Sequence, residues 1–157
     1  MKTVETLKIE QVLRKSLFGS NPKLAKEYGT TEVTVGFQRD SHGKEIVDFL
    51  SYDPKKDIFK CYEIKVTIAD FHSDAAKSWH GNYNYLVLSR DLYLKQDIMK
   101  WITEIPAGVG IITINTDNSL KETVRRAVKQ DIDADTKEML KDSLIRTLFY
   151  QNQKYNE

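Results

Sequence analysis

Two carboxylates and a lysine, Asp48, Glu63 and Lys65, fall at positions where neighbouring β-strands would bring them together. Two opposed carboxylates repel each other unless a cation or a shifted pKa relieves the charge. A Mg²⁺ ion that takes one oxygen ligand from each would provide that relief. The three residues are therefore candidates for a metal-dependent hydrolytic site, in which Lys65 would act on the attacking water or on developing negative charge.

The strands that would position these residues are two apolar, aromatic-rich runs joined by Asp53-Pro54-Lys55-Lys56. Asp at the first position and Pro at the second favour a type I turn. If residues 54–57 form a four-residue loop, paired positions sum to 111, and Lys65 shares the face of Glu63. The expected pairs are then Tyr52 with Phe59, Leu50 with Cys61, and Asp48 with Glu63.

The residues around this acidic pair are apolar on both faces of the hairpin. A sheet that is apolar on both faces is covered by helices on both sides, so the charges should lie at the edge of a covered sheet. The alternative is a solvated face on which Lys65 pairs with Glu63 or Asp48. Chance matches are common in a chain of which 30% is charged.

The hairpin resembles the core of the PD-(D/E)XK nuclease superfamily, in which a metal-binding Asp lies on one strand and a Glu-x-Lys on the next. Over about residues 31–130 the chain looks similar to the MmcB-like DNA-repair nucleases and related phage proteins, most specifically from Glu63 to Phe71. Val47 stands where the superfamily name has Pro.

The resemblance implies a DNA nuclease that uses Mg²⁺ or Mn²⁺ in DNA repair, recombination or phage DNA processing. Asp48 and Glu63 would be metal ligands, and the backbone carbonyl of Ile64 would be a third. The alternative is a non-catalytic DNA-binding or interaction module that has the same fold.

A further carboxylate usually completes such sites, and Glu32 and Glu10 are the candidates. Glu32 would lie opposite Asp48 if paired positions in the preceding hairpin sum to 80. Glu10, or less favourably Glu5, lies on the first predicted helix, where many superfamily members carry an acidic residue.

The candidates for DNA contact are Lys77, Trp79, Arg125 and Arg126, with Lys129 beside them, although a core indole and solvated helix faces explain these residues equally well.

Length and composition indicate a single domain, residues 1–157, with 24 basic and 23 acidic residues. Because this charge is balanced, DNA binding requires a local basic patch. The chain shows neither a signal peptide nor an apolar run near 18 residues, so we expect a cytoplasmic protein without a membrane partner. Its one cysteine, Cys61, agrees with a reducing compartment, and Cys61, His42, His72 and His80 lack the spacing of a zinc site.

Apolar periodicity and turn signals predict an α/β chain with a mixed sheet of about five strands flanked by helices, which agrees with a restriction-endonuclease-like three-layer sandwich. A capping box at Thr67 and Asp70 should open one short helix. A C-terminal amphipathic helix over about 135–151 offers a surface for a homodimer. The predicted helices are 4–18, 67–78, 91–102, 119–128 and 135–151, and the predicted strands are 31–37, 45–52, the Glu-x-Lys strand, 85–89 and 110–114.

Overall fold

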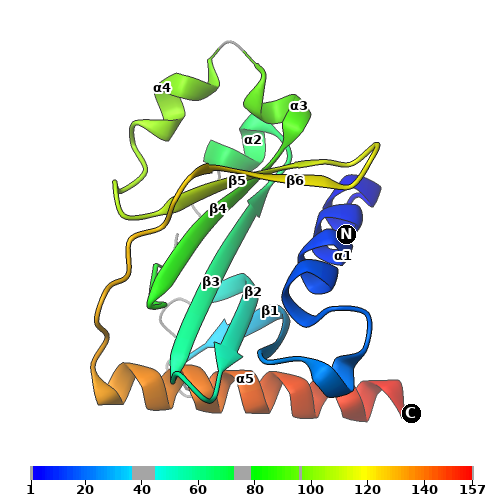
Figure 1. Cartoon of the computed structure of the whole chain (residues 1–157), viewed down its shortest axis with the longest axis vertical. Coiled ribbons are helices and arrows are strands. Elements are labelled where there is room, and N and C mark those ends of the chain that lie inside the picture. The colour runs from blue at the N-terminus through cyan, green and yellow to red at the C-terminus, as the bar shows by residue number, and fades with distance from the viewer. Residues whose placement is uncertain (1, 37–44, 73–78, 96, 157) are drawn as a thin grey trace.

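One six-stranded mixed sheet organises the fold, and its strand order, β1-β2-β3-β4-β5-β6, follows the chain (Figure 1). The computed structural model describes residues 2–36, 45–72, 79–95 and 97–156. The β3–β4 and β4–β5 pairs are parallel and the other three are antiparallel. The strands are β1 (Tyr28–Val35), β2 (Glu45–Asp53), β3 (Ile58–Lys65), β4 (Tyr83–Ser89), β5 (Gly110–Asn115) and β6 (Leu120–Arg125).

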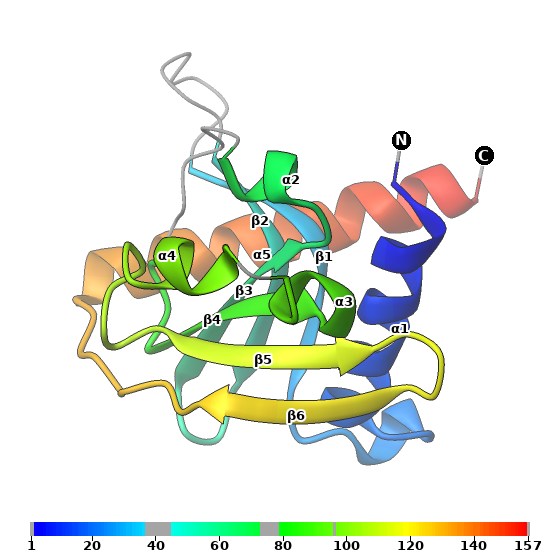
Figure 2. The same ribbon diagram turned by 90° about the horizontal axis from the view of Figure 1, so that it is seen from above.

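Helices lie against both faces of this sheet (Figures 1 and 2). On one face, Ile9 and Leu13 of α1 pack against Phe49 and Tyr62. On the other face, the C-terminal helix packs on β1 to β3, and the crossover helices pack on β4 and β5. The helices are α1 (Val4–Phe18), η1 (Pro22–Leu24), α2 (Ile68–His72), α3 (Arg90–Tyr93), α4 (Ile98–Ile102) and α5 (Ala134–Tyr155).

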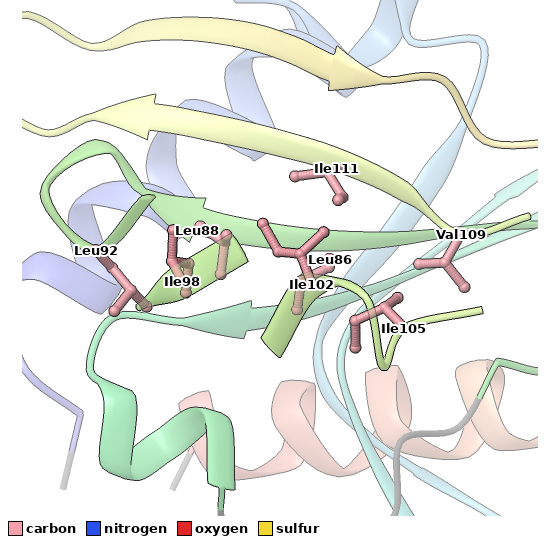
Figure 3. Packing of buried hydrophobic residues seen from close by; sticks show 8 residues of the cluster. All are labelled: Leu86, Leu88, Leu92, Ile98, Ile102, Ile105, Val109 and Ile111. Carbon is pink, nitrogen blue, oxygen red and sulfur yellow. The ribbon is translucent and has the colours of Figure 1, made fainter. Parts of the chain in front are cut away.

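Strand register fixes which side chains share a face. Cys61 pairs with Asn84 and Glu63 with Leu86 across the parallel β3–β4 pair, so Glu63 lies on the face that the crossover helices cover. The core there is aliphatic, and Figure 3 shows it between β4, β5 and the segment that contains α3 and α4. Burying each of these large aliphatic side chains stabilises the fold by about 1.5–3 kcal/mol.

The hairpin of β2 and β3 has the register that the turn chemistry predicted. Asp53 pairs with Ile58, which leaves the four-residue loop 54–57. The Asp53 Oδ1 accepts hydrogen bonds from the backbone N–H groups of Lys55 at 3.0 Å and Lys56 at 3.2 Å, and this closes the turn. The expected pairs of Tyr52 with Phe59 and of Leu50 with Cys61 are confirmed.

The predicted helix over 119–128 is wrong, because residues 120–125 form β6 at the edge of the sheet. A tight turn precedes the strand: the Asn118 Oδ1 accepts from the Leu120 N–H at 3.0 Å, and Ser119 has a positive φ of 60°. This turn returns the chain antiparallel to β5, whose open edge supplies backbone partners. Pairing with a distant strand thus outweighs the local helical spacing.

The predicted helix over 91–102 is divided into α3 and α4. Leu92 and Ile98 are both buried in one hydrophobic cluster, and each is 1% exposed. In a continuous helix, side chains six residues apart would point in directions about 120° apart. Breaking the helix between them lets both side chains enter the core.

The capping box before α2 is confirmed: the Asp70 N–H donates to the Thr67 Oγ1 at 3.0 Å, and the Thr67 N–H donates to the Asp70 Oδ2 at 3.3 Å. Residues 73–78 of that predicted helix lie outside the described residues. The C-terminal helix runs over Ala134–Tyr155 and is longer than the predicted 135–151. Among the residues that the structure describes, no helix is both long and apolar enough to cross a membrane.

Candidate functional site

The candidate site lies where β2 and β3 separate. Pairing between the two strands ends at Phe49 and Tyr62, one residue before the expected pair of Asp48 with Glu63. Instead, the Asp48 Oδ2 accepts a hydrogen bond from the Ile64 backbone N–H at 2.7 Å. The Asp48 carboxylate therefore takes the position of a strand partner, and the predicted Asp48–Glu63 ladder pair does not form.

The strand alternation of β2 breaks at Asp48. Val47 and Leu50 both belong to the cluster that contains α5, whereas Phe49 packs on the α1 side. In a regular strand, residues three apart point to opposite faces. The break directs the Asp48 side chain toward β3, within the plane of the sheet, rather than onto either face.

Glu63 is buried with the Asp48 carboxylate beside it. Its residue exposure is 3%, and its Oε1 has no hydrogen-bond partner among the described residues. Burial, then the charge of Asp48 and a hydrogen bond with it, raise the pKa of Glu63 to about 9, and the attraction of Lys65 offsets this only in part. The Glu63 carboxyl is thus largely protonated at neutral pH.

Lys65 is also buried, at 5% exposure, two residues beyond Glu63 on the same face. Within the described ranges, no carboxylate lies within ion-pair distance of its ammonium group. A buried, unpaired ammonium is costly. Glu63 and Lys65 therefore do not lie on a solvated face.

The β1–β2 hairpin has the register predicted for Glu32, but Glu32 and Asp48 are not paired in it. Pairs in the β1–β2 hairpin sum to 80, as Thr31 with Phe49 and Val33 with Val47 do. Glu32 itself is not paired: its φ is 54°, and its side chain is 60% exposed. The left-handed backbone turns the side chain away from a regular position opposite Asp48.

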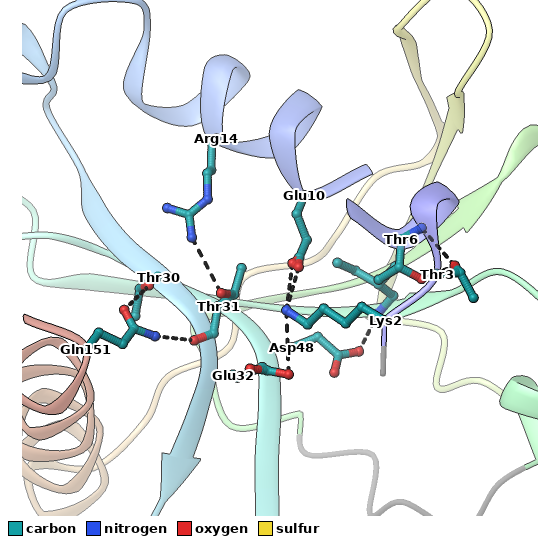
Figure 4. Close-up of polar contacts among 11 residues, drawn as sticks. Lys2, Thr3, Thr6, Glu10, Arg14, Thr30, Thr31, Glu32, Asp48 and Gln151 are labelled. Atoms are coloured by element: carbon teal, nitrogen blue, oxygen red, sulfur yellow. Dashed lines mark hydrogen bonds and ion pairs between the residues drawn. The ribbon is translucent and has the colours of Figure 1, made fainter. Parts of the chain in front are cut away.

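Glu10 is buried on α1 and is bound by a lysine for which the sequence suggested no role (Figure 4). The Lys2 Nζ donates to the two carboxylate oxygens of Glu10 at 2.5 and 2.8 Å and lies 3.5 Å from the Glu32 Oε1. Lys2 precedes the helix and lies eight residues before Glu10, so the i, i+4 spacing of a helical ion pair did not indicate this contact. An internal cation thus binds both carboxylates that were candidates to complete the site.

The described residues do not contain a group of three or more His, Cys, Asp or Glu side chains arranged to hold a metal ion. What the fold brings together is the pair Asp48 and Glu63, with Lys65 beside it. A second pair missed from the sequence lies close by: His80 Nε2 and Glu45 Oε2 are 2.7 Å apart, and the charge of Glu45 contributes to the raised pKa of Glu63. These two residues lie on separate segments and show no motif spacing.

The candidates for DNA contact do not form one surface. Trp79 packs against the aliphatic core, which supports the interpretation of a core indole. Arg125 donates to the backbone carbonyls of Val109 at 2.9 Å and Pro106 at 3.1 Å, so it ties β6 to the preceding loop. Arg126 lines a surface hollow. Arg125 and Arg126 do not belong to a helix, because β6 replaces it, and Lys77 lies outside the described residues.

Comparison with known proteins identifies a fold relative but no family. No protein-family model matches the chain, and no curated protein matches it. A solved structure of a protein of unknown function from Silicibacter pomeroyi has a TM-score of 0.64 and 16% sequence identity, and the alignment covers 96% of this chain and 87% of that one. At this identity the likeness shows a shared mixed α/β fold with a helix-flanked sheet.

Proposed function

We propose that this protein is a Mg²⁺- or Mn²⁺-dependent DNA nuclease with a restriction-endonuclease-like three-layer sandwich fold, acting in DNA repair, recombination or phage DNA processing. The observation that carries the proposal is the burial of Glu63 and Lys65 on one strand next to the Asp48 carboxylate, whose charge helps to raise the pKa of Glu63. Burying such groups costs stability and contributes little to packing. A bound divalent cation would offset that cost, which supports an assignment to function.

The residues present fit a divalent cation of this kind. The Glu63 Oε1 is a buried oxygen without a hydrogen-bond partner among the described residues. Asp48 and the Ile64 carbonyl would add oxygen ligands from the place where β2 and β3 separate. Mg²⁺ is commonly held by one or two carboxylates, and waters complete its octahedron. When bound, the ion would lower the pKa of a water and neutralise phosphate charge.

The chain's own residues have separate tasks in this proposal. Asp48 is held in place by the Ile64 N–H, so its carboxylate is oriented before any ligand arrives. Glu63 must release its proton to act as a ligand, and Lys65 is near enough to favour the ionised carboxylate. The Lys65 ammonium would then stabilise negative charge that develops on the phosphate.

The test is cleavage of labelled linear, nicked, flapped and four-way DNA with Mn²⁺, by the parent and by three variants: Asp48→Asn, Glu63→Gln and Lys65→Ala. We expect each variant to lose at least 100-fold in rate, because each removes a ligand or a transition-state charge. The exposed Lys95→Ala is the matched control and should cleave as the parent does. Calorimetry should show Mn²⁺ binding to the parent and to Lys65→Ala but not to Asp48→Asn.

Cleavage by all three variants at the parent rate would contradict the proposal. Metal binding without cleavage of any DNA would favour the alternative, a non-catalytic DNA-binding or interaction module on the same fold.

A further inference from the structure

A continuous hollow crosses the face of the sheet that α1 covers only in part. Lys60 pairs with Tyr83, and Tyr85 follows two residues later, so all three lie on the α1 side beyond the helix. Three hollows of about 720, 550 and 220 Å³ follow this face. The first two share Ser16 and Lys121, and the second and third share Lys60 and Tyr85. Together they form one groove from the β5–β6 turn to the β2–β3 turn.

This groove, called here the basic groove, concentrates the positive charge of the molecule. Three acidic residues also line it: Asp53, Glu27 and Asp117. Asp53 caps the β2–β3 turn, and the Glu27 Oε1 lies 3.0 Å from the Lys60 Nζ. The groove has a net charge of +3 from six basic and three acidic residues, whereas the whole chain has +1. The six basic residues are Lys8, Lys15, Lys56, Lys60, Lys121 and Arg126.

Most of these cations have no anionic partner. In the part of the chain that the structure describes, Lys8, Lys15, Lys121 and Arg126 form no ion pair. The Lys121 ammonium donates to the Ser16 Oγ at 3.0 Å, and burial, followed by the charge of Lys60, lowers its pKa. A ligand with several negative charges would relieve this crowding.

The floor of the groove carries aromatic rings. Tyr62 and Tyr85 stack with their centroids 4.9 Å apart and an interplanar angle of 12°, and Tyr85 remains partly exposed. An open sheet face with aromatic rings among lysines is suited to single-stranded nucleic acid, whose unpaired bases stack while its phosphates contact cations. The groove crosses four strands, which corresponds to about 15 Å and thus to a few nucleotides. The bases of a duplex are not free to stack on such a floor.

The groove and Glu10 lie on opposite flanks of α1. Glu10 and Arg14 face β1, where the Arg14 Nη2 donates to the Thr31 Oγ1 at 3.4 Å. Lys15 and Ser16 face the β5–β6 hairpin, which lies beside α1 in Figure 2. The distance between the flanks is about one helix diameter, roughly 10 Å.

We propose that the basic groove binds a single strand of DNA, with phosphates on its lysines and a base against Tyr85. This inference rests on the proposed function for the identity of the polyanion, and it names single-stranded DNA as the substrate class. The groove lies on the α1 face of the sheet, whereas Glu63 and Lys65 lie on the opposite face, so the groove would bind a part of the strand away from the scissile phosphate.

The test is fluorescence anisotropy with a labelled 15-residue oligothymidylate in EDTA, so that binding is measured without cleavage. We expect Lys15→Glu/Lys56→Glu to bind at least tenfold more weakly than the parent and to lower the slope of log affinity against log salt by about 1–2. The neutralising pair Lys15→Gln/Lys56→Gln should show a smaller loss. The matched control, Lys95→Glu/Lys100→Glu, reverses two exposed charges on the opposite side of the sheet and should change affinity by less than twofold.

A second measurement does not depend on variants: an oligonucleotide that contains 5-bromodeoxyuridine should cross-link to the peptide with Tyr83 and Tyr85. Equal affinity of the groove variant and the parent would overturn the inference. So would equal losses in the control pair, duplex DNA binding as tightly as the single strand, or binding to anionic phospholipid vesicles in place of DNA.

The two proposals fail differently. If parent and Asp48→Asn both lack metal-dependent cleavage while the groove variant loses single-strand binding, the nuclease proposal fails and the groove assignment stands. If cleavage depends on Asp48 while the groove variant binds and cleaves as the parent does, only the groove assignment fails.

Discussion

At the scale of single residues, Glu63 is a carboxyl group that is costly to bury. The carboxyl is buried beside Asp48, and its pKa of about 9 means that folding favours the protonated form. A group whose folded pKa lies above its unfolded value of 4.5 contributes stability at low pH and loses that contribution as the pH rises through the folded pKa. The apo protein should therefore become less stable between about pH 4.5 and pH 9 because of this residue.

Glu63→Gln should remove this pH dependence. We expect the variant to be more stable than the parent in EDTA by about 1–3 kcal/mol at pH 8, because the amide, unlike the carboxylate, does not have to take up a proton on folding. The difference should shrink toward pH 5. Chemical denaturation at several pH values measures it, and the exposed Glu104→Gln is the control, with no change expected. A destabilised Glu63→Gln at pH 8 would show that the carboxylate has a partner in the apo fold.

At the scale of elements, the turn before β6 determines how the edge of the sheet is built. The Asn115 Oδ1 accepts from the Asp117 N–H at 2.9 Å, and the Asn118 Oδ1 accepts from the Leu120 N–H at 3.0 Å. Ser119 takes a left-handed backbone conformation, which costs an L-residue about 1–2 kcal/mol. The pairing of β6 with β5 outweighs this cost.

Ser119→Gly should therefore stabilise the protein by about 0.5–1 kcal/mol, because glycine adopts positive φ without the steric penalty. The control is Thr123→Gly within β6, where φ is not positive and glycine should destabilise by about 0.5–1 kcal/mol. Thermal unfolding of both variants measures the two changes. A fall in stability for Ser119→Gly would mean that the turn does not adopt this conformation in solution.

At the scale of the whole molecule, α5 closes the sheet face that β1 to β3 present. Leu140 and Leu144 are buried in the cluster of Val47 and Leu50. Near its C-terminal end, Gln151 accepts from the Thr30 Oγ1 at 2.7 Å and donates to the Thr31 carbonyl at 3.1 Å. The helix thus supports the two strands that carry the candidate site.

Leu144→Ala should destabilise the protein by about 2–4 kcal/mol through lost burial and the cavity left behind. The adjacent Ile145 is 67% exposed, so Ile145→Ala should change stability by less than about 0.5 kcal/mol. Urea denaturation of the two variants provides the comparison. A comparable loss in both, increasing with dilution, would indicate that the outer face of α5 is buried in a homodimer.

The sequence by itself determined the features that depend on neighbouring residues. The register of the β2–β3 hairpin followed from a four-residue loop and Asp53, since turn chemistry and the two-residue period of a strand are local. The α2 capping box and α1 were predictable for the same reason. The register also predicted that Asp48 and Glu63 lie near each other, but it did not predict that pairing ends at Phe49 and Tyr62 or that Asp48 accepts from the Ile64 N–H.

Only the tertiary structure decided the features that depend on distant partners. β6 exists because β5 offers an open edge, and α3 and α4 separate because Leu92 and Ile98 both enter one core. The contact of Lys2 with Glu10 and the basic groove arise where α1 packs on part of the sheet, so they join residues that no sequence spacing relates. Packing energy comes from contacts between residues far apart in the chain, and a local sequence pattern does not predict those contacts.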